Sequence, residues 1–452
     1  MIKRTLKQVQ EMVSGWGLEP AFEQRMMEGV HIDSRAIDPG NLYIPIIGAR
    51  VDGHTFTDGA FKNGASAVLW QEGIEGKPAD VPVIYVKDTE KALQQLSSAY
   101  RDQLNFKIVG ITGSNGKTST KDILASILSA NFNVHKTAGN FNSEFGMPIT
   151  ILRAPEDTDI CVLEMGMRGL GQISLLSKIA RPDAAIITII GEAHIEELGS
   201  RENISIAKFE ITDGLTADGV FVYPGEEPLL TRKAAGLGTK LLTFGDSTEN
   251  DYYPTSIGID GEGMVFTIAQ SDETFHLPIL GKHNVMNTLS AIAVAKNFGM
   301  EFSDIAKGLA GLSMSSMRME LSKAANGMTI INDAYNSSPT SVRATLDLLA
   351  SLTGYDKKIV VLGDMLELGE HEAAYHQEVG AAIDPQAVDT VLTFGPLANA
   401  YLAPASRVAD TRSFETKDAL AQSLENEGLS GVIVLIKGSR GMRLEEVIES
   451  LA

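Results

Sequence analysis

The nine residues Gly110–Thr118 constrain this chain more than any other segment. They have the sequence GITGSNGKT. The apolar stretch Ile108–Ile111 leads into them and predicts a short strand, and Thr118–Leu128 has apolar residues at helical spacing. Glycines between a strand and a helix let backbone N–H groups approach phosphate oxygens, and the helix N-terminus adds a favourable field. The segment therefore predicts a phosphate-binding loop.

Two side chains of this loop carry its chemistry. The ammonium of Lys117 supplies positive charge for the β- and γ-phosphates of a nucleotide, and the hydroxyl of Thr118 can bind Mg²⁺. The spacing differs from the usual pattern G-x-x-x-x-G-K-[ST], because Ile111 stands where that pattern has glycine. A plain glycine-rich turn is the alternative, and the combination of strand, Gly-Lys-Thr and helix disfavours it.

Strands and helices are expected to alternate on both sides of the loop. Apolar stretches between amphipathic segments indicate a parallel sheet that is covered on both faces. The predicted strands are Leu42–Ile47, Ala67–Trp70, Asp159–Leu163, Ala184–Ile190, Lys358–Leu362, Thr390–Phe394 and Gly431–Ile436, and helices are predicted at Thr89–Arg101 and Val285–Phe298.

A length of 452 residues suggests about three domains. A Ser/Met stretch at Ser313–Ser316 indicates the second boundary. We predict an α/β protein with a mixed N-terminal substrate domain, a central P-loop-type ATPase domain with a parallel sheet and a C-terminal Rossmann-like domain. Their expected ranges are residues 1–104, 105–313 and 314–452.

Composition excludes several classes of protein. With 38 Lys and Arg against 58 Asp and Glu, the net charge is −20, which disfavours nucleic acid as a partner. No apolar run approaches the roughly 20 residues of a membrane helix, so no membrane insertion is expected. The basic start Met1–Arg4 precedes a Gln- and Glu-containing stretch, which predicts no secretory signal. One cysteine, Cys161, allows no internal disulfide, so a cytoplasmic location is expected.

Three further residues are candidates for metal binding. Glu164 and His194 follow the predicted strands at 159–163 and 184–190, and the carboxyl ends of parallel strands face the ligand crevice. Taken singly, Glu164 can be a surface carboxylate, and His194 is more often a loop histidine with satisfied hydrogen bonds than a metal ligand. Lys208, in a helical segment, is by itself a solvated lysine.

The loop at 112–118 resembles the TGTNGKT-type loop of the Mur ligases and the folylpolyglutamate synthetases, which are ATP-dependent enzymes that form amide bonds. Further segments resemble the Mur ligases in the expected order over essentially the whole chain. These are DSR at 33–35, GARVDGH at 48–54, TAGNFN at 137–142 with GMP at 146–148, EMGMR at 164–168, GKHNVMN at 281–287, DAYNSSP at 333–339 and KGSR at 437–440.

This resemblance implies roles around ATP. It implies catalytic roles for Lys117, Lys208, His194 and Arg318. It implies Mg²⁺ binding by Thr118, Glu164, His194 and Lys208, the last as a carbamate formed with CO₂. The ATP-binding residues that it implies are Gly113, Ser114, Asn115, Gly116, Lys117, Thr118 and Ser119, with Asn287 at adenine, Arg318 at the phosphates and Asp333 at ribose.

The resemblance also implies two other substrates. The DSR and DGH segments are expected to hold a uridine diphosphate group through Ser34, Arg35, Arg50, Asp52, Gly53 and His54. The acyl substrate is expected beside Thr137, Asn140 and Asn142, and the incoming amine beside Tyr335, Asn336 and Lys437. One departure is Phe221–Gly225, where the family commonly has an Asn-x-Asp segment.

Within the family, the segments at 137–148 and 164–168 favour the ligases that join D-alanyl-D-alanine to UDP-N-acetylmuramoyl-tripeptide in peptidoglycan precursor synthesis. Such enzymes use ATP to form an acyl phosphate and release ADP and phosphate, and a monomer is expected. A ligase that adds a diamino acid, a folylpolyglutamate synthetase and a non-catalytic nucleotide-binding regulator are the alternatives.

Overall fold

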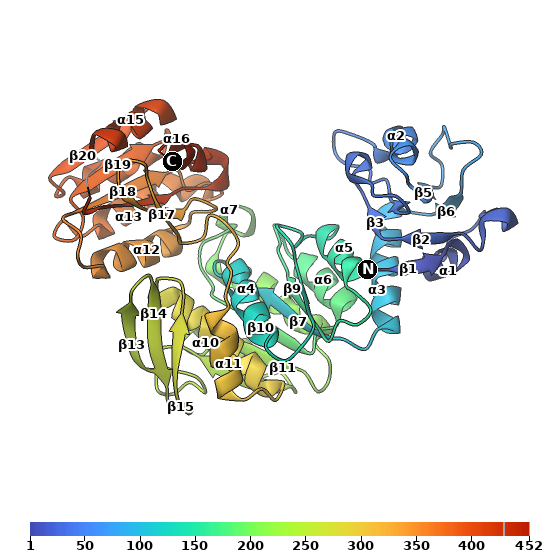
Figure 1. Ribbon diagram of the computed structural model, residues 1–452, viewed down its shortest axis with the longest axis horizontal. Helices are drawn as coiled ribbons and strands as arrows, with labels where there is room; N and C mark the ends of the chain where they lie inside the picture. The colour runs from blue at the N-terminus through green and yellow to red at the C-terminus, as the bar shows by residue number, and fades with distance from the viewer. Residues whose placement is uncertain (428–429, 452) are drawn as a thin grey trace.

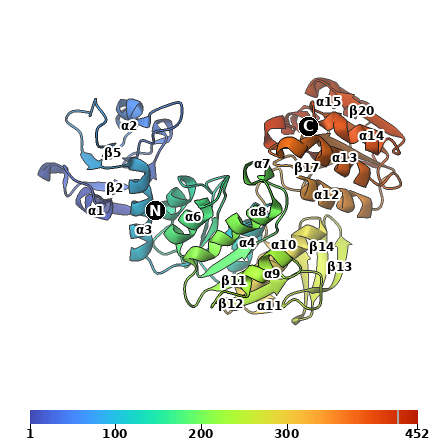
Figure 2. The same ribbon diagram turned by 180° about the vertical axis from the view of Figure 1, so that it is seen from behind.

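The computed structural model describes residues 1–427 and 430–451 (Figure 1). Three α/β regions follow one another along the long axis of the molecule, with the N-terminal and C-terminal regions at opposite ends (Figures 1 and 2). This confirms the predicted fold class. No helix in the described part of the chain is long and apolar enough to cross a membrane.

The N-terminal region has two small sheets. One pairs β1 (Lys3–Thr5) with β2 (Met26–Glu28) antiparallel, and the other has the parallel order β3-β4-β5-β6. The remaining elements are β3 (Val30–His31), β4 (Leu42–Tyr43), β5 (Ala67–Gln71), β6 (Val83–Val86), α1 (Leu6–Met12), α2 (Thr57–Lys62) and α3 (Thr89–Gln103).

The prediction of a strand over Leu42–Ile47 was wrong in length, since β4 ends at Tyr43. Pro45 follows two residues later and has no N–H to donate to a strand ladder, so the chain leaves the sheet there. The long helix α3 then connects this region to the central one (Figure 1).

The central region is built on a parallel sheet with the order β12-β11-β10-β7-β9-β8. Its strands are β7 (Lys107–Thr112), β8 (Val134–Lys136), β9 (Ile160–Glu164), β10 (Ala184–Ile187), β11 (Val220–Pro224) and β12 (Lys240–Phe244). Its helices are α4 (Lys117–Leu128), α5 (Gly146–Arg153), α6 (Gln172–Ala180), α7 (Ile195–Leu198), α8 (Arg201–Phe209), α9 (Pro228–Ala234), α10 (Lys282–Asn297) and α11 (Phe302–Ala310).

Both faces of this sheet are buried, which explains its continuous apolar strands. Along β10, Ala184 and Ile186 belong to the core on the side of α4 and α10, whereas Ala185 and Ile187 belong to the core on the side of α6. No pattern in the sequence indicated the antiparallel sheet of β13 (Pro254–Asp260), β14 (Gly263–Ile268) and β15 (Ser271–Leu277), which packs beside α11.

The C-terminal region has the sheet order β16-β17-β21-β18-β19-β20, in which only β16 is antiparallel to its neighbour. Its strands are β16 (Glu320–Lys323), β17 (Thr329–Asp333), β18 (Lys357–Gly363), β19 (Thr390–Phe394), β20 (Asp410–Phe414) and β21 (Val432–Lys437). Its helices are α12 (Pro339–Ser351), α13 (Glu372–Ala382), α14 (Leu402–Ala405), α15 (Lys417–Glu427) and α16 (Glu445–Ser450).

The domain divisions expected after residues 104 and 313 fall outside helices and strands. The first lies between the end of α3 and the start of β7, and the second between the end of α11 and the start of β16. These divisions stay proposals.

Candidate functional site

A cavity of about 780 Å³ lies where the carboxyl ends of β7 and β9 meet the start of the C-terminal region. Most of the residues predicted to bind ATP, the metal ion, the acyl substrate and the amine line it. They are Ser114, Asn115, Gly116, Lys117, Thr118, Ser119, Asn140, Asn142, Glu164, His194, Lys208, Asn287, Arg318, Asp333, Tyr335, Asn336 and Lys437.

Two glycines let the phosphate loop pass close to its neighbours. Gly113 has φ +152°, and a Cβ there would lie 1.8 Å from Oγ1 of Thr188. Gly116 has φ +82°, and a Cβ there would lie 2.7 Å from Oδ1 of Asn287. Any side chain at these positions would therefore push the loop away from the cavity.

Lys117 curls back over the loop, where its Nζ donates a hydrogen bond to the carbonyl of Gly113 at 2.8 Å. Desolvation in the cavity lowers the pKa of Lys117, Glu164 opposes that shift, and the charge of Arg318 adds to it. The loop thus presents a weakly hydrated ammonium group where phosphate is expected.

Glu164 joins the loop to the neighbouring strand. It ends β9 and is 3% exposed. Its Oε2 accepts a hydrogen bond from Oγ1 of Thr118 at 2.8 Å, and its Oε1 accepts one from Nδ2 of Asn142 at 2.7 Å. The structure thus brings a hydroxyl and a carboxylate together beside the phosphate loop. Both groups have oxygen atoms that can bind a metal ion.

Lys208 projects from α8 into the same cavity and is 1% exposed. Burial, together with the nearby charge of Lys117, lowers the pKa of Lys208 well below its ordinary value. No carboxylate of residues 1–427 or 430–451 forms an ion pair with it. The side chain is therefore a buried amine whose surroundings disfavour its charged form, unlike the solvated lysine that the bare sequence suggests.

His194 lies at the cavity edge in the left-handed conformation, with φ +67°. Its Nδ1 is 3.3 Å from Oε2 of Glu367, which comes from the C-terminal region. His194, Glu197 and Glu367 place possible metal-ligating atoms within 4.8 Å of one another. Glu164 is not part of that cluster, so the predicted pairing of Glu164 and His194 around one ion stays a prediction.

The C-terminal region contributes an ion pair to the cavity, and the segment before β16 contributes Arg318. Asp333 and Lys437 end β17 and β21, lie opposite each other in register, and form an ion pair. Nζ of Lys437 also donates to the carbonyl of Asn336 at 3.0 Å. The guanidinium of Arg318 lies 4.1 Å from the centre of the Tyr335 ring.

Two direct hydrogen-bonded contacts join the regions at the phosphate loop. Nδ2 of Asn115 donates to Oγ of Ser338 at 3.0 Å. Oε2 of Glu192 accepts hydrogen bonds from the amide of Thr340 at 3.2 Å and from its hydroxyl at 2.6 Å. Sequence reasoning missed Glu192 and Glu367. Glu192 stands two residues before His194, but no spacing rule marked it, because its partner lies 148 residues away.

The residues expected to bind uridine diphosphate lie apart from this cavity, in the N-terminal region. Nδ1 of His54 lies 2.6 Å from Oδ1 of Asp52, and its Nε2 accepts from the amide of Gln71 at 3.2 Å. His54 therefore holds its own turn together. Arg35 is exposed and pairs with Asp33, and Arg50 is exposed. Their roles stay predictions.

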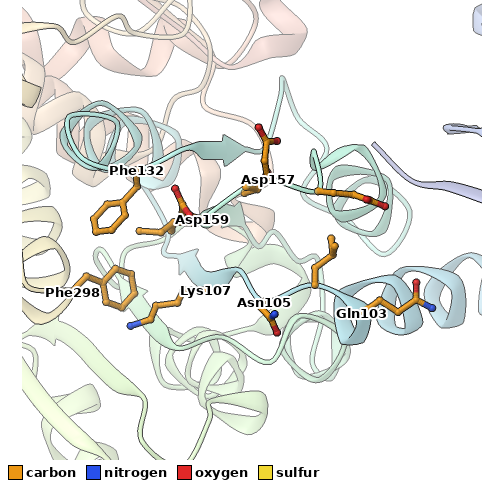
Figure 3. Close-up of a pocket in the computed structure, with 11 residues that line it drawn as sticks. Gln103, Asn105, Lys107, Phe132, Asp157, Asp159 and Phe298 are labelled. Carbon is orange, nitrogen blue, oxygen red and sulfur yellow. The ribbon is translucent and has the colours of Figure 1, made fainter.

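A second cavity of about 540 Å³ lies at the other end of the central sheet, near the start of β7 (Figure 3). Phe132, Phe298 and Lys107 line one side, and Nζ of Lys107 is 4.8 Å from the centre of the Phe298 ring. None of the predicted site residues lines this cavity.

The fold and the site define an ATP-using, amide-forming ligase. Three family descriptions match the chain in order. These are "Mur ligase family, catalytic domain" at residues 27–101, "Mur ligase middle domain" at residues 111–295 and "Mur ligase, glutamate ligase domain" at residues 317–440. The chain belongs to the Mur ligase family.

Comparison with individual proteins shows members of the family to which this chain is similar over all or nearly all of its length. The chain is 48% identical over 458 residues to the UDP-N-acetylmuramoyl-tripeptide–D-alanyl-D-alanine ligase of Bacillus subtilis (strain 168), with 100% of this chain and 99% of that protein covered. The crystal structure of MurF from Acinetobacter baumannii superposes with a TM-score of 0.91 at 30% identity, covering 100% and 99%. The MurF ligase of Thermotoga maritima in complex with ADP has a TM-score of 0.83 at 28% identity, covering 94% and 97%.

Proposed function

We propose that this chain uses ATP to join D-alanyl-D-alanine to UDP-N-acetylmuramoyl-tripeptide, releasing ADP and phosphate. One observation carries the proposal. A single cavity combines the phosphate loop and Glu164 with Arg318, Asp333 and Lys437 from a separate sheet. A ligase needs this combination, because a phosphoryl group and an incoming amine must both reach one carboxylate. The full-length similarity to the Bacillus subtilis enzyme supports the choice of substrates.

The terminal carboxylate of the tripeptide is a poor electrophile, so ATP first converts it to an acyl phosphate with ADP as the leaving group. The amine of D-alanyl-D-alanine then attacks the acyl carbon and a C–N bond forms. The nitrogen loses a proton, and the C–O bond to phosphate breaks, so that phosphate leaves with the electron pair of that bond. Charge neutralisation is the main demand of the first step. Lys117 supplies it from the phosphate loop, and Arg318 supplies it from the segment before β16.

The residues beside the phosphate loop suit Mg²⁺, since a hydroxyl and a carboxylate are the oxygen ligands that this ion prefers. Thr118, Glu164, His194 and Lys208 as a carbamate would hold it. When bound, Mg²⁺ would neutralise charge on the transferring phosphoryl group.

Carbamylation of Lys208 requires a neutral amine. Nζ of the neutral amine attacks the carbon of CO₂, an N–C bond forms as one C=O π bond opens, and one proton is released, so that a neutral amine becomes an anionic carbamate. The buried position and lowered pKa of Lys208 support this step. A mass that exceeds the sequence mass by one CO₂ at neutral pH, and that loses it on acidification, is the expected result.

The remaining residues are proposed to position the substrates. Asn287 would contact adenine, Asp333 the ribose, and Asn140 and Asn142 the acyl substrate. Tyr335, Asn336 and Lys437 would lie near the dipeptide. In the N-terminal region, Arg35 and Arg50 would neutralise the uridine diphosphate. We also propose a monomer in the cytoplasm, where ATP and reducing conditions suit the single Cys161.

The direct test measures ADP release with the two substrates added separately and together. Release is expected only when UDP-N-acetylmuramoyl-tripeptide and D-alanyl-D-alanine are both present. Turnover with a diamino acid and UDP-N-acetylmuramoyl-dipeptide, or with a folate and glutamate, would instead favour the other ligases. ATP binding without any substrate-dependent ADP release would indicate a regulator.

A further inference from the structure

Two adjacent charged residues, Lys121 and Asp122, are buried in α4, and the proposed function gives them no role. Each is 1% exposed. They lie about one turn beyond the phosphate loop, because α4 begins at Lys117. Buried charges persist in proteins where they are paired and hydrogen-bonded, since desolvation of an ion is costly. Their partners therefore indicate what the two residues do.

Both oxygens of the Asp122 carboxylate have partners outside α4. Oδ1 accepts a hydrogen bond from Nζ of Lys136 at 2.6 Å and lies 3.4 Å from Nζ of Lys121. Oδ2 accepts two hydrogen bonds from Ser315, one from the amide at 3.0 Å and one from the hydroxyl at 2.7 Å. Burial raises the pKa of Asp122, but Lys121, Lys136 and Ser315 outweigh it and hold the pKa below its ordinary value.

Ser315 lies in the connector between the central and C-terminal regions, after α11 and before β16. Just beyond it, Met317 and Met319 have φ of +59° and +55°. Left-handed conformations are unfavourable for such residues and persist where the surroundings hold them. Arg318 stands between these two methionines and lines the cavity. The direction of the Arg318 side chain therefore depends on how the connector is held.

Lys121 contacts the segment 137–142, which is expected to lie beside the acyl substrate. Its Nζ donates to the carbonyl of Thr137 at 3.0 Å. Oγ1 of Thr137 in turn accepts from the amide of Glu164 at 3.0 Å. One buried pair thus touches the phosphate-loop helix, the segment that leads to Asn142 and the interdomain connector.

We propose that Asp122 is a positioning residue that clamps the connector at Ser315 to the phosphate-loop helix, so that the C-terminal region pivots after residue 315 and carries Arg318 to the phosphates of ATP. This inference rests on the proposed function. It assigns Asp122 no contact with substrate. Asp122 is proposed to affect catalysis only by holding the connector in place.

The main test replaces Ser315, because its side chain can be shortened without leaving a charge buried alone. We expect Ser315→Ala to lower kcat about tenfold, as loss of a hydrogen bond to a charged group does, with the KM for ATP changed less than about threefold. Ser315→Thr keeps the hydroxyl and should retain most of the activity. The matched control is Ser316→Ala, since Ser316 is exposed and its side chain has no hydrogen bond among the described residues.

A second measurement separates positioning from folding. Dyes on Asp218→Cys and Asp418→Cys, both exposed, report the distance between the two regions, and the only natural cysteine is buried. Addition of ATP with Mg²⁺ should give one narrow distance distribution in the parent protein and a broader one in Ser315→Ala. Asp122→Asn should broaden it as well, provided that its circular dichroism matches the parent.

A Ser315→Ala protein with parental kcat and a parental distance distribution would overturn the inference, even if its melting temperature fell. Failure of the proposed function has a different signature. In that case the parent protein itself shows no ADP release that depends on both substrates, whereas the distance measurement with ATP still tests the clamp.

Discussion

At the scale of single residues, the cavity concentrates ionisable groups that a folded chain usually keeps in water. Lys117 and Lys208 both have a pKa lowered first by burial, and each feels a further cation, Arg318 for the first and Lys117 for the second. An unfolded chain would not hold these amines together. Their protonated forms are therefore destabilised by burial and by mutual repulsion, and a bound phosphate would stabilise them.

Lys117→Ala should nearly abolish ligation and leave the fold intact, because the ammonium faces the cavity and its hydrogen-bond partners among the described residues are the loop carbonyls of Gly113 and Ser114. ADP release and the far-ultraviolet circular dichroism of the variant provide the measurement. Lys178→Ala is the matched control, since that side chain is 63% exposed on α6. Normal turnover by Lys117→Ala would contradict the assigned role.

Stability should depend on pH through Lys208. Burial lowers the pKa of Lys208 in the folded protein, whereas the unfolded chain keeps the amine protonated up to its ordinary pKa of 10.5. The unfolded state thus binds more protons, and the free energy of unfolding should rise with pH until that value is reached. Lys208→Met should flatten this slope and raise stability near neutral pH. Urea unfolding in CO₂-free buffers over a pH series measures it, and an unchanged slope would contradict the buried neutral amine.

At the scale of elements, the ends of strands and helices build the site. Glu164, Asp333 and Lys437 are the last residues of β9, β17 and β21. Opposite them, the N-terminus of α12 carries a capping box in which Ser338 and Ser341 satisfy each other's backbone amides. Because Ser338 also contacts Asn115, a helix cap and an interdomain contact share one hydroxyl.

Ser338→Ala should therefore lower the free energy of unfolding by about 1 kcal/mol through loss of the cap. The control is Ser351→Ala at the other end of α12, where the hydroxyl bonds only a carbonyl of the preceding turn. Its effect should stay within about 0.5 kcal/mol. Denaturant unfolding compares the two, and equal effects would show that the cap contributes nothing particular.

At the scale of the whole molecule, the hydrogen bonds and ion pairs described across the ATP cavity are few. They join Asn115 to Ser338, Glu192 to Thr340 and His194 to Glu367. Interfaces of this kind permit relative motion of domains. A reactive acyl phosphate needs protection from water, so closure of the C-terminal region over the cavity is expected.

Small-angle scattering should show a smaller radius of gyration when ATP and Mg²⁺ are added. Arg318→Ala should reduce this change, because the variant removes a cation that the C-terminal region directs into the cavity. A control with UDP alone should leave the C-terminal region unmoved. The same compaction in Arg318→Ala would show that other contacts close the molecule.

The amino-acid sequence by itself determined the local structure. The glycines of the loop, the apolar strands on both sides of it and the charged residues at the ends of β9 and β21 indicated the α/β fold and most residues of the cavity. Such features are local, since backbone freedom, helix spacing and strand burial depend on near neighbours in the chain.

Only the tertiary structure determined which polar and charged residues are buried and which of them, far apart in the sequence, lie in contact. Lys208 became a buried amine, His54 turned inward to Asp52, and Asp122 met Ser315 at a distance of 193 residues. The antiparallel sheet at 254–277 and the partners of Glu192 and Glu367 also appeared only there. Burial and ion pairing depend on which surfaces pack together, and no periodicity in a single chain records that packing.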